Sequence, residues 1–331
     1  MARRKARMPQ GKKIQPAVKT FNFILPIGTP STVDLSQVAS LMNRRFYRQG
    51  LNWAVAGIQF FTTGTGGITV SKIPDTWVAS NSWEKGFRAW QKMNNDALDE
   101  AESVRPRFLD YKVFMDATHH QAGSANNVLP IDSAGNIATA GEWEYSKYVV
   151  PFGPASPGNT TDFDIVWTGA NFPGASPAGT DAVSLIEGYA ASRGLPQVLD
   201  PNTPTDAADA DGSTPENWLS ALQNEGIDQD SEVLADMIDE NNQAPYPFEN
   251  DGANLDTMYP GGANQLPGLQ IHSNSLVSAT TIGGQTSVAG TNFQGGLIRI
   301  DNTIDVGNIS MLVHLVPGSH RGYMCQPMTD V

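Results

Sequence analysis

The sequence predicts an all-β fold, a sandwich of two sheets with about eight main strands, helical insertions and a disordered basic N-terminal arm. Three observations carry this prediction. Glycine (32) and proline (22) account for 54 of the 331 residues, which is typical of short strands joined by turns and long loops. Strand patterns of period two lie on both sides of helical patterns, so strands distant in sequence must pair. The first 19 residues carry seven Lys or Arg and no acid.

The composition excludes several classes of protein. The only cysteine, Cys325, rules out an intrachain disulfide framework and a cysteine-based zinc site. No segment approaches the roughly 18 apolar residues of a membrane-spanning helix, and the basic N terminus is not followed by an apolar stretch. We therefore expect a soluble, non-secreted protein without a membrane span.

The N-terminal arm, residues 1–19, is opposite in charge to the rest of the chain. The net charge is −13, so the remainder carries −13 − 7 = −20. A segment with this charge and few apolar side chains is expected to stay flexible. Its expected partner is a nucleic acid, because Lys and Arg near phosphates release counterions, although a nuclear-localisation signal or a solubility tail remains open. The basic residues are Arg3, Arg4, Lys5, Arg7, Lys12, Lys13 and Lys19.

Residues 20–199 form the first part of the predicted sandwich. A strand pattern over residues 18–27 begins it, because Phe21 and Phe23 alternate with polar and smaller side chains. Asp34 then stands where a residue would cap a short helix with one apolar side.

A second basic cluster follows this helix. Arg44, Arg45 and Arg48 flank Phe46 and Tyr47. Arginines interleaved with aromatic rings suit a surface that touches phosphates and bases, and we assign all three arginines to nucleic-acid binding. The alternative is that they pair with acids of a neighbouring subunit or cover apolar surface.

The segment 43–90 organises the predicted fold. Residues 53–61 are apolar on both faces, which predicts a central strand buried on two sides. A glycine turn at residues 64–67 leads to a β-branched alternation at residues 68–72, which predicts that the two strands form a hairpin.

The pattern becomes helical after Pro74. Ser80, Asn81 or Ser82 is suited to cap a helix of about residues 82–102. The apolar side of this helix is expected to pack on the sheet. It consists of Trp83, Phe87, Trp90, Ala97 and Leu98.

Further patterns complete the first part of the sandwich. Strands are predicted at residues 108–116, 142–150 and 163–168, and a short helix at residues 181–192. The strand at 142–150 is expected to place Lys147 on the same face as its aromatic residues. A polar loop with His119 and His120 is expected after the first of these strands, and a metal site there is a minor alternative.

Residues 200–256 form an acidic segment with fifteen Asp or Glu and no Lys or Arg. Two helices are predicted within it, so we interpret it as an acidic helical insertion at the outer surface or a subunit rim, where solvent screens the charges. Structural calcium at Asp206, Asp209 and Asp211 is an alternative, but the ligand order of a calcium loop is absent from the sequence.

The C-terminal part, residues 257–331, returns to strands. They are predicted at residues 269–272, 276–282, 296–301 and 309–316. No dinucleotide-binding glycine loop, nucleophile elbow or Walker lysine occurs in the chain, so we expect neither an enzyme nor a cofactor.

Several short motifs between residues 30 and 150 resemble those of a known family. The family is the capsid proteins of small circular single-stranded DNA viruses that encode a replication-initiator protein. The motifs are Val33-Asp34-Leu35-Ser36, Asn43-Arg44-Arg45-Phe46-Tyr47-Arg48-Gln49-Gly50, Ile73-Pro74-Asp75-Thr76-Trp77-Val78 and Trp83-Glu84-Lys85-Gly86-Phe87-Arg88-Ala89-Trp90.

The resemblance implies a viral jelly roll that assembles with copies of itself into an icosahedral shell. It also implies that the basic arm lies inside on a single-stranded DNA genome, and that the protein is found in the virion and, during assembly, in the host nucleus. A host receptor is a further expected partner, of unknown identity. Coat proteins of small RNA viruses share this layout, so the choice of DNA depends on the resemblance and not on the charge. A cellular nucleic-acid-binding protein and a carbohydrate-binding or hydrolytic β-sandwich are the remaining alternatives.

Overall fold

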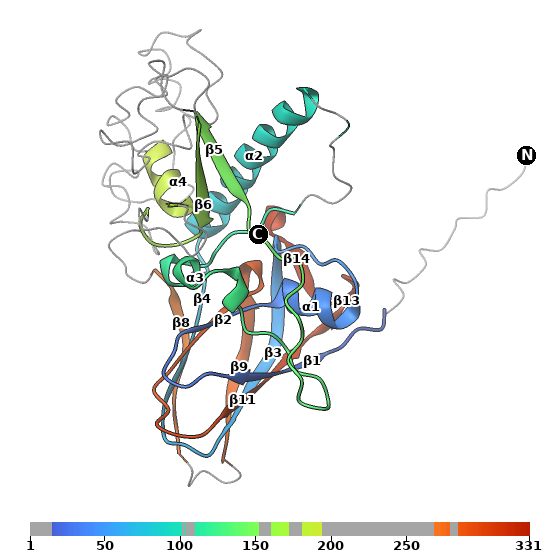
Figure 1. The fold of residues 1–331 in the computed structure, drawn as a ribbon, viewed down its shortest axis with the longest axis vertical. Coiled ribbons are helices and arrows are strands. Elements are labelled where there is room, and N and C mark those ends of the chain that lie inside the picture. Colours follow the sequence, from blue (N-terminus) through green and yellow to red (C-terminus); the bar gives the residue numbers. More distant parts are fainter. Residues whose placement is uncertain are drawn as a thin grey trace, which may run out of the picture.

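The computed structural model describes residues 15–100, 103, 110–151, 160–171, 181–193, 268–278 and 284–331. Two large antiparallel sheets make up one half of the described structure, and a small sheet with helices makes up the other (Figure 1). The acidic segment 200–256, with its predicted helices and calcium ligands, lies outside the described residues.

The first large sheet has the strand order β1-β11-β3-β14, and β9 also pairs with β3. All of these pairings are antiparallel. The strands are β1 (Thr20–Leu25), β3 (Leu51–Thr62), β9 (Gln285–Phe293), β11 (Ile309–Leu315) and β14 (Cys325–Pro327).

The second large sheet has the order β2-β10-β4-β8, again antiparallel throughout. Its strands are β2 (Ser31–Asp34), β4 (Gly66–Lys72), β8 (Gln270–Val277) and β10 (Leu297–Asn302). The order in both sheets interleaves strands from the two ends of the chain, as the sequence predicts.

The remaining elements are small. A third sheet contains β5 (Lys147–Pro151), β6 (Thr160–Val166) and β7 (Ala182–Ser184), and a two-stranded ribbon contains β12 (Pro317–Gly318) and β13 (Gly322–Tyr323). The helices are α1 (Leu35–Asn43), α2 (Trp77–Glu100), α3 (Ala117–Ala122) and α4 (Leu185–Arg193), with 3-10 turns at Ser124–Asn126, Gln294–Gly296 and Met328–Asp330.

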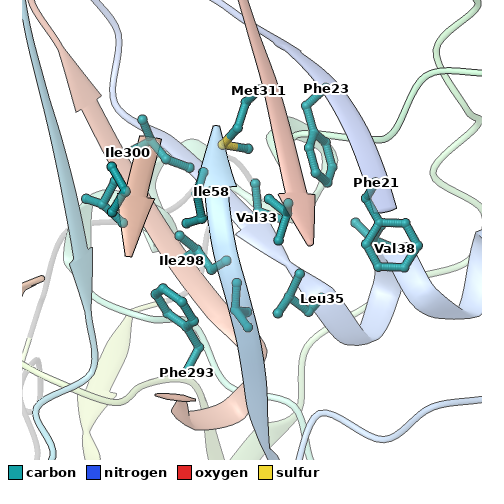
Figure 2. Packing of buried hydrophobic residues seen from close by; sticks show 14 of the residues in the cluster. Phe21, Phe23, Val33, Leu35, Val38, Ile58, Phe293, Ile298, Ile300 and Met311 are labelled. Atoms are coloured by element: carbon teal, nitrogen blue, oxygen red, sulfur yellow. The ribbon is translucent and has the colours of Figure 1, made fainter. Parts of the chain in front are cut away.

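The main core lies between the two large sheets. Figure 2 shows apolar side chains from both sheets and from α1 pointing toward one another. Burying each Leu, Ile or Phe side chain stabilises the fold by about 1.5–3 kcal/mol, so this cluster holds the two sheets together. The prediction of a β-sandwich class is therefore confirmed. Labelled members include Phe21, Phe23, Val33, Ile58, Phe293, Ile298, Ile300 and Met311.

The first strand and helix of the described residues fold as the sequence predicts. Alternate residues of β1 are buried, and α1 begins after Asp34, whose Oδ1 accepts hydrogen bonds from the backbone of Ser36 (2.9 Å) and Gln37 (3.3 Å). The helix ends at Arg44, which adopts a left-handed conformation with φ of 52°. The strand β2, which directly precedes the cap, was not predicted because it has only four residues.

β3 is central, as predicted, but the expectation of two buried faces is wrong. Trp53 and Val55 are buried with Ile58 and Phe60, whereas their neighbours along the strand are half-buried or exposed. The buried face changes phase because Ala56 is an extra residue opposite β11, where the register shifts between His314 and Leu315. This bulge keeps one continuous face on the core.

The predicted hairpin between β3 and β4 is also wrong. β4 pairs with β10 and β8 in the opposite sheet. The glycine turn crosses from one sheet to the other because it is bound to the segment 303–307: Thr65 N–H donates to Asp305 Oδ1 (2.8 Å) and Gly67 N–H donates to Thr303 Oγ1 (2.9 Å).

This crossing makes Gly64 and Gly67 respond differently to substitution. A Cβ at Gly64 would overlap the backbone carbonyl oxygen of Val306, whereas a Cβ at Gly67 would lie 3.4 Å from the Thr303 hydroxyl, an ordinary contact. We expect Gly64→Ala to lower the free energy of unfolding by roughly 2–4 kcal/mol, because the two segments must separate. Gly67→Ala is the matched control and is expected to cost less than about 1 kcal/mol. Urea unfolding of both variants checks this, and equal losses would contradict it.

Helix α2 begins five residues earlier than predicted. It starts after Thr76, whose hydroxyl accepts the Ala79 N–H (3.4 Å). Ser80 and Ser82, predicted as caps, lie inside the helix, where their hydroxyls donate to the carbonyls of Trp77 (3.1 Å) and Ala79 (2.9 Å).

The aromatic face of α2 packs mainly on the small sheet and α4, and its cluster also includes Leu297 of β10. Trp83 and Trp90 belong to a second cluster with residues of β5, β6 and α4. The Trp83 ring stacks on Phe87 with centroids 5.2 Å apart. This cluster makes the helical half of the molecule, seen around α2 in Figure 1, a packed unit with its own core.

The predicted strand at 108–116 is wrong for its described residues. Between Asp110 and Asp116 the chain makes one isolated bridge, from Phe114 to Val166. The side chain of Gln49 takes the place of a neighbouring strand, because its Oε1 accepts the Val113 N–H (2.6 Å) and its Nε2 donates to the Val113 carbonyl (3.1 Å).

The two histidines lie on α3 and not in a polar loop, and both are buried. Burial lowers the pKa of His119 to about 3, so its ring is neutral: Nδ1 accepts the Met115 N–H (3.0 Å) and Nε2 donates to Asn127 Oδ1 (2.7 Å). His120 Nε2 lies 2.8 Å from Asp164 Oδ2. These bonds give the histidines a structural role in joining α3 to its surroundings.

Two predictions for residues 142–192 also need correction. The strand expected at 142–150 is β5, which begins only at Lys147 because residues 142–146 are irregular. Within β5, Tyr148 is buried and Lys147 is exposed. The helix expected at 181–192 is preceded by the short strand β7.

In the C-terminal part, β10 and β11 confirm two predicted strands. The strands predicted at 269–272 and 276–282 are a single strand, β8, in their described part. β9 was missed because Gln285–Phe293 is rich in Thr, Ser, Asn and Gly, although it pairs along most of β3.

Candidate nucleic-acid interface

The chain enters the sandwich on one side of the β12–β13 ribbon. Val18 N–H donates to Asn43 Oδ1 (2.9 Å), and the Tyr323 hydroxyl donates to the Val18 carbonyl (2.6 Å). The predicted arm residues Arg3, Arg4, Lys5, Arg7, Lys12 and Lys13 precede this attachment and lie outside the described residues. The chain therefore joins the body of the protein at Asn43 and Tyr323.

Lys19 differs from the expectation that the flexible arm extends through it. Its Nζ donates to the Gly322 carbonyl and lies 4.5 Å from the centre of the Tyr323 ring. Burial lowers the pKa of Lys19. The Lys19 ammonium group therefore binds the body of the protein, at the turn of the β12–β13 ribbon and the Tyr323 ring.

The other three predicted arginines are exposed beside this attachment. Arg44 ends α1 in a left-handed conformation, which turns the chain so that the following residues run along the surface. Arg45 donates from Nη1 to the Pro16 carbonyl (3.3 Å), and Arg48 is also exposed. The structure therefore brings the second basic cluster next to the base of the arm.

A fourth arginine, Arg321, joins this cluster from the far end of the sequence. It has φ of 48° in the tight turn of the β12–β13 ribbon and donates from Nη1 to the Phe46 carbonyl. The Tyr47 hydroxyl donates to the Arg321 carbonyl (3.0 Å). We call Arg44, Arg45, Arg48 and Arg321 the arginine patch. Sequence reasoning missed Arg321, since a single basic residue in a Ser-His-Arg-Gly turn carries no signal of its position in space.

The arginine patch adjoins a cluster of buried aromatic side chains. Tyr47, Trp53 and Tyr323 are buried and in mutual contact, with ring centroids 5.4–5.9 Å apart. Burial raises the pKa of Tyr323 to about 12, so its hydroxyl stays protonated and holds the Val18 carbonyl at all ordinary pH values. Four guanidinium groups on a fixed base form a surface suited to binding phosphates, because Arg donors match phosphate oxygens.

Asp110 is the acid beside this patch, and burial raises its pKa to about 7. Lys112 and Arg48 lower that pKa, and Asp34 raises it further. A carboxyl group with a raised pKa favours folding while it is protonated. Its contribution is full below about pH 3.8, the unfolded value, and is lost as the pH rises through about 7.

Replacing this group is therefore expected to stabilise the protein in a pH-dependent way. We expect Asp110→Asn to raise the free energy of unfolding by roughly 2–4 kcal/mol at pH 8 and to leave it nearly unchanged at pH 4. Urea unfolding of both proteins at the two pH values measures this difference. A destabilised variant at pH 8 would show that the carboxylate holds the fold together.

Among the described residues, no helix is long and apolar enough to cross a membrane, and no three His, Cys, Asp or Glu side chains gather where they could hold a metal ion. No family model, no curated protein and no solved structure matches this chain.

Proposed function

We propose that the chain is a viral capsid protein that assembles with copies of itself into a closed icosahedral shell and packages a single-stranded DNA genome. The basic arm and the arginine patch together face the genome in this proposal. The protein is then a component of the virion, passes through the host nucleus during assembly and carries no enzymatic activity. A host receptor is expected to bind the outer surface.

The observation that carries the proposal is the place where the chain joins the body. Pro16 and Val18 contact the body beside the arginine patch, so the basic sequence of residues 1–13 leads directly to a surface with four exposed arginines. The rest of the chain is strongly acidic. Charges segregated in this way suit a protein that holds a polyanion on one side, because like charges elsewhere repel it.

The strand order supports a jelly roll as the type of β-sandwich. Eight strands pair as β1-β11-β3-β9 and β2-β10-β4-β8. Chain neighbours such as β1 and β2, β3 and β4, or β10 and β11 lie in opposite sheets, which is the arrangement of two interleaved Greek keys. Capsid proteins, lectins and cupins share that fold, so the arm and the patch favour the capsid among them.

Exposed apolar side chains support self-assembly. Leu276 on β8 is 88% exposed and Ile271 on the same strand is 63% exposed, while Ile137 is 65% exposed. β8 is also the last strand of its sheet in the part of the chain that the structure describes. A monomer gains nothing from apolar side chains on an open sheet edge, whereas a neighbouring subunit would cover them.

Replacing Leu276 tests this surface. We expect Leu276→Lys to prevent particle formation, because each subunit contact would bury a charge, and to leave the stability of the monomer within about 0.5 kcal/mol. Leu276→Met is the control and should still assemble. Sedimentation of both variants measures the outcome, and particles formed by the Lys variant would place the subunit contacts elsewhere.

Three alternative functions explain some or none of these observations. A coat protein of a small RNA virus explains the same arm and patch, and charge does not separate it from a DNA capsid. A cellular nucleic-acid-binding β-sandwich explains the patch but not the exposed edge of β8. The carbohydrate-binding or hydrolytic alternative explains neither.

Nuclease protection tests the proposal. Protein expressed without its genome is incubated with single-stranded DNA or RNA, treated with nuclease and sedimented. The proposal predicts that DNA sediments with the protein and resists digestion. Full digestion of both nucleic acids would contradict packaging, and protection of RNA alone would favour the RNA-virus alternative.

A further inference from the structure

An open pocket of about 490 Å³ lies at one edge of the sandwich, where β1 and β2 are the outermost strands of their sheets in the described part of the chain. The segment 128–131 joins these two strands. Val128 N–H donates to the Thr32 carbonyl (2.9 Å). Ile131 N–H donates to the Asn22 carbonyl (2.8 Å). Residues of this segment, of both strands and of α3 line the pocket, which has room for more than one aliphatic side chain.

Two exposed isoleucines line this pocket. Ile24 on β1 is 42% exposed and points away from the core, because its neighbours Phe23 and Leu25 are buried. Ile137 is 65% exposed. A monomer does not benefit from apolar side chains at an open pocket, so these residues indicate a surface that another molecule covers.

Hydrogen bonds fix the loop that carries Ile137. The Asp132 carboxylate accepts the backbone N–H groups of Ala134 (2.8 Å) and Asn136 (2.9 Å) through Oδ1. Asp132 N–H also donates to the Asn136 carbonyl (3.0 Å). Ile137 is therefore held in place before a partner arrives, which lowers the entropy cost of binding.

The opposite edge of the sandwich carries the most exposed of the large apolar side chains among the described residues. β8 is the outermost strand there, at the other end of the sheet that begins with β2. Leu276 on β8 is 88% exposed and points away from the core, because Val277 beside it is buried. Asn274, two residues away, is exposed on the same face. The molecule thus has an apolar projection on one edge and an open pocket with apolar sides on the other.

Both edges are poor in charged side chains, although the chain as a whole is acidic. Residues 257–298, which include β8 and β9, contain no Asp, Glu, Lys or Arg. Neither do residues 20–33 and 117–131, which supply most of the pocket lining. Arg299 also lines the pocket, but it is buried and paired with Asp116. Copies with a net charge of −13 repel one another, so they approach most closely where neither surface is charged.

We propose that this pocket binds Leu276 of a second copy of this chain. Leu276 enters the pocket beside Ile24 and Ile137, and β8 of one copy lies along the β1–β2 edge of the next. Polar groups without charge accompany the apolar contact on both copies, namely Asn274 on β8 and the exposed Asn126 at the pocket. This contact presupposes the proposed function and specifies which two surfaces of the capsid protein meet.

A contact between opposite edges suits a closed shell better than a contact between two β8 edges. When β8 of one copy meets β8 of another, both copies have used the same edge and assembly through this contact stops at a dimer. When β8 meets the β1–β2 edge, each pair keeps one free edge of either kind for the next copy, and the repeated contact closes into a ring. An icosahedral shell requires such rings around its symmetry axes.

Cross-linking between two single-cysteine variants tests the contact. Leu276→Cys and Ile137→Cys are each made together with Cys325→Ser, which removes the natural thiol, and the two proteins are assembled separately and as an equal mixture. A short bis-maleimide is then added. We expect covalent dimers with one copy of each variant in the mixture, and no covalent dimers in either variant alone. Arg88→Cys, 73% exposed on α2, replaces Ile137→Cys in the control mixture and should give no dimers.

A charge at the pocket gives a second test, which decides the matter if the cysteine variants do not assemble. Ile137→Lys should abolish particle formation, as expected for Leu276→Lys, because the contact would bury an ammonium group. Ile137→Leu is the control and should still form particles. Sedimentation measures both variants, and particles formed by Ile137→Lys would overturn the assignment of the pocket.

The outcomes separate this contact from the proposed function. Particles of the mixture without mixed dimers would overturn the contact and leave capsid assembly intact. Covalent dimers in Leu276→Cys alone would overturn it in favour of pairing between two β8 edges. If the unaltered protein forms no particles, the proposed function itself fails, and the contact fails with it.

Discussion

Deleting residues 1–13 is expected to abolish packaging while the protein still folds. The deletion removes six basic residues but none of the contacts of Val18 or Lys19 with the body. Each phosphate contact with a single strand contributes about 0.7 to the logarithmic salt slope, so the slope of DNA binding should fall by about 4. Titration with a single-stranded oligonucleotide at several salt concentrations measures this change, and empty shells are expected to remain.

A longer deletion, of residues 1–19, serves as the control. It also removes the bonds of Val18 to Asn43 and Tyr323, so its melting temperature should drop, whereas that of the shorter deletion should not. If the shorter deletion leaves the salt slope unaltered, the arm does not hold the genome. The arm would then be a nuclear address or a solubility tail.

Replacing the four arginines of the patch by glutamine is expected to have the next largest effect. The change should lower the salt slope by about 3 and weaken DNA binding, because four phosphate contacts are lost. Glutamine keeps the size and polarity of the side chain. The contact of Arg321 with the Phe46 carbonyl is replaced at the same time, so the melting temperature of the variant must be recorded with its affinity.

Arg88 provides the matched control for this experiment. It lies on α2, 73% exposed, where it pairs with Glu84. Arg88→Gln removes the same charge from another part of the surface and should leave the salt slope unchanged. Equal effects of one patch arginine and Arg88 would show that the protein responds only to total charge and that the patch is not a specific surface.

The sequence predicts an element correctly where neighbouring residues alone determine its structure. Asp34 caps α1, and alternation in β1 sets its buried face, because both depend on neighbours within a few residues. The hairpin of β3 and β4 could not be excluded in this way. The turn crosses between sheets because it bonds to Thr303 and Asp305, about 240 residues away along the chain.

Long-range contacts also explain why a strand was wrongly predicted at residues 110–116 and why β9 was not predicted. Residues 110–116 have the alternation of a strand, but the side chain of Gln49 satisfies the backbone of Val113 and no strand is needed there. β9 has the polar composition of a turn, yet it forms a strand because it pairs with the central strand β3 along most of its length. Hydrophobic pattern alone contains no information about such partners.

The candidate site was predicted in part. Arg44, Arg45 and Arg48 were identified from arginines interleaved with aromatic residues, and the structure places Arg45 and Arg48 beside the base of the arm. Arg321 and Asp110 carry no signal in the sequence, since each is brought to the site by contacts across 60 residues or more. Their roles follow only from the folded arrangement.

In the proposed function, this protein forms a closed shell through repeated contacts between identical subunits. Electron microscopy of the purified protein, with and without single-stranded DNA, tests it most directly. We expect uniform, closed, symmetric particles, with nuclease-resistant DNA inside those formed by the protein with an intact arm. A stable monomer or dimer across a range of pH and salt concentrations, with no particles in either preparation, would contradict it.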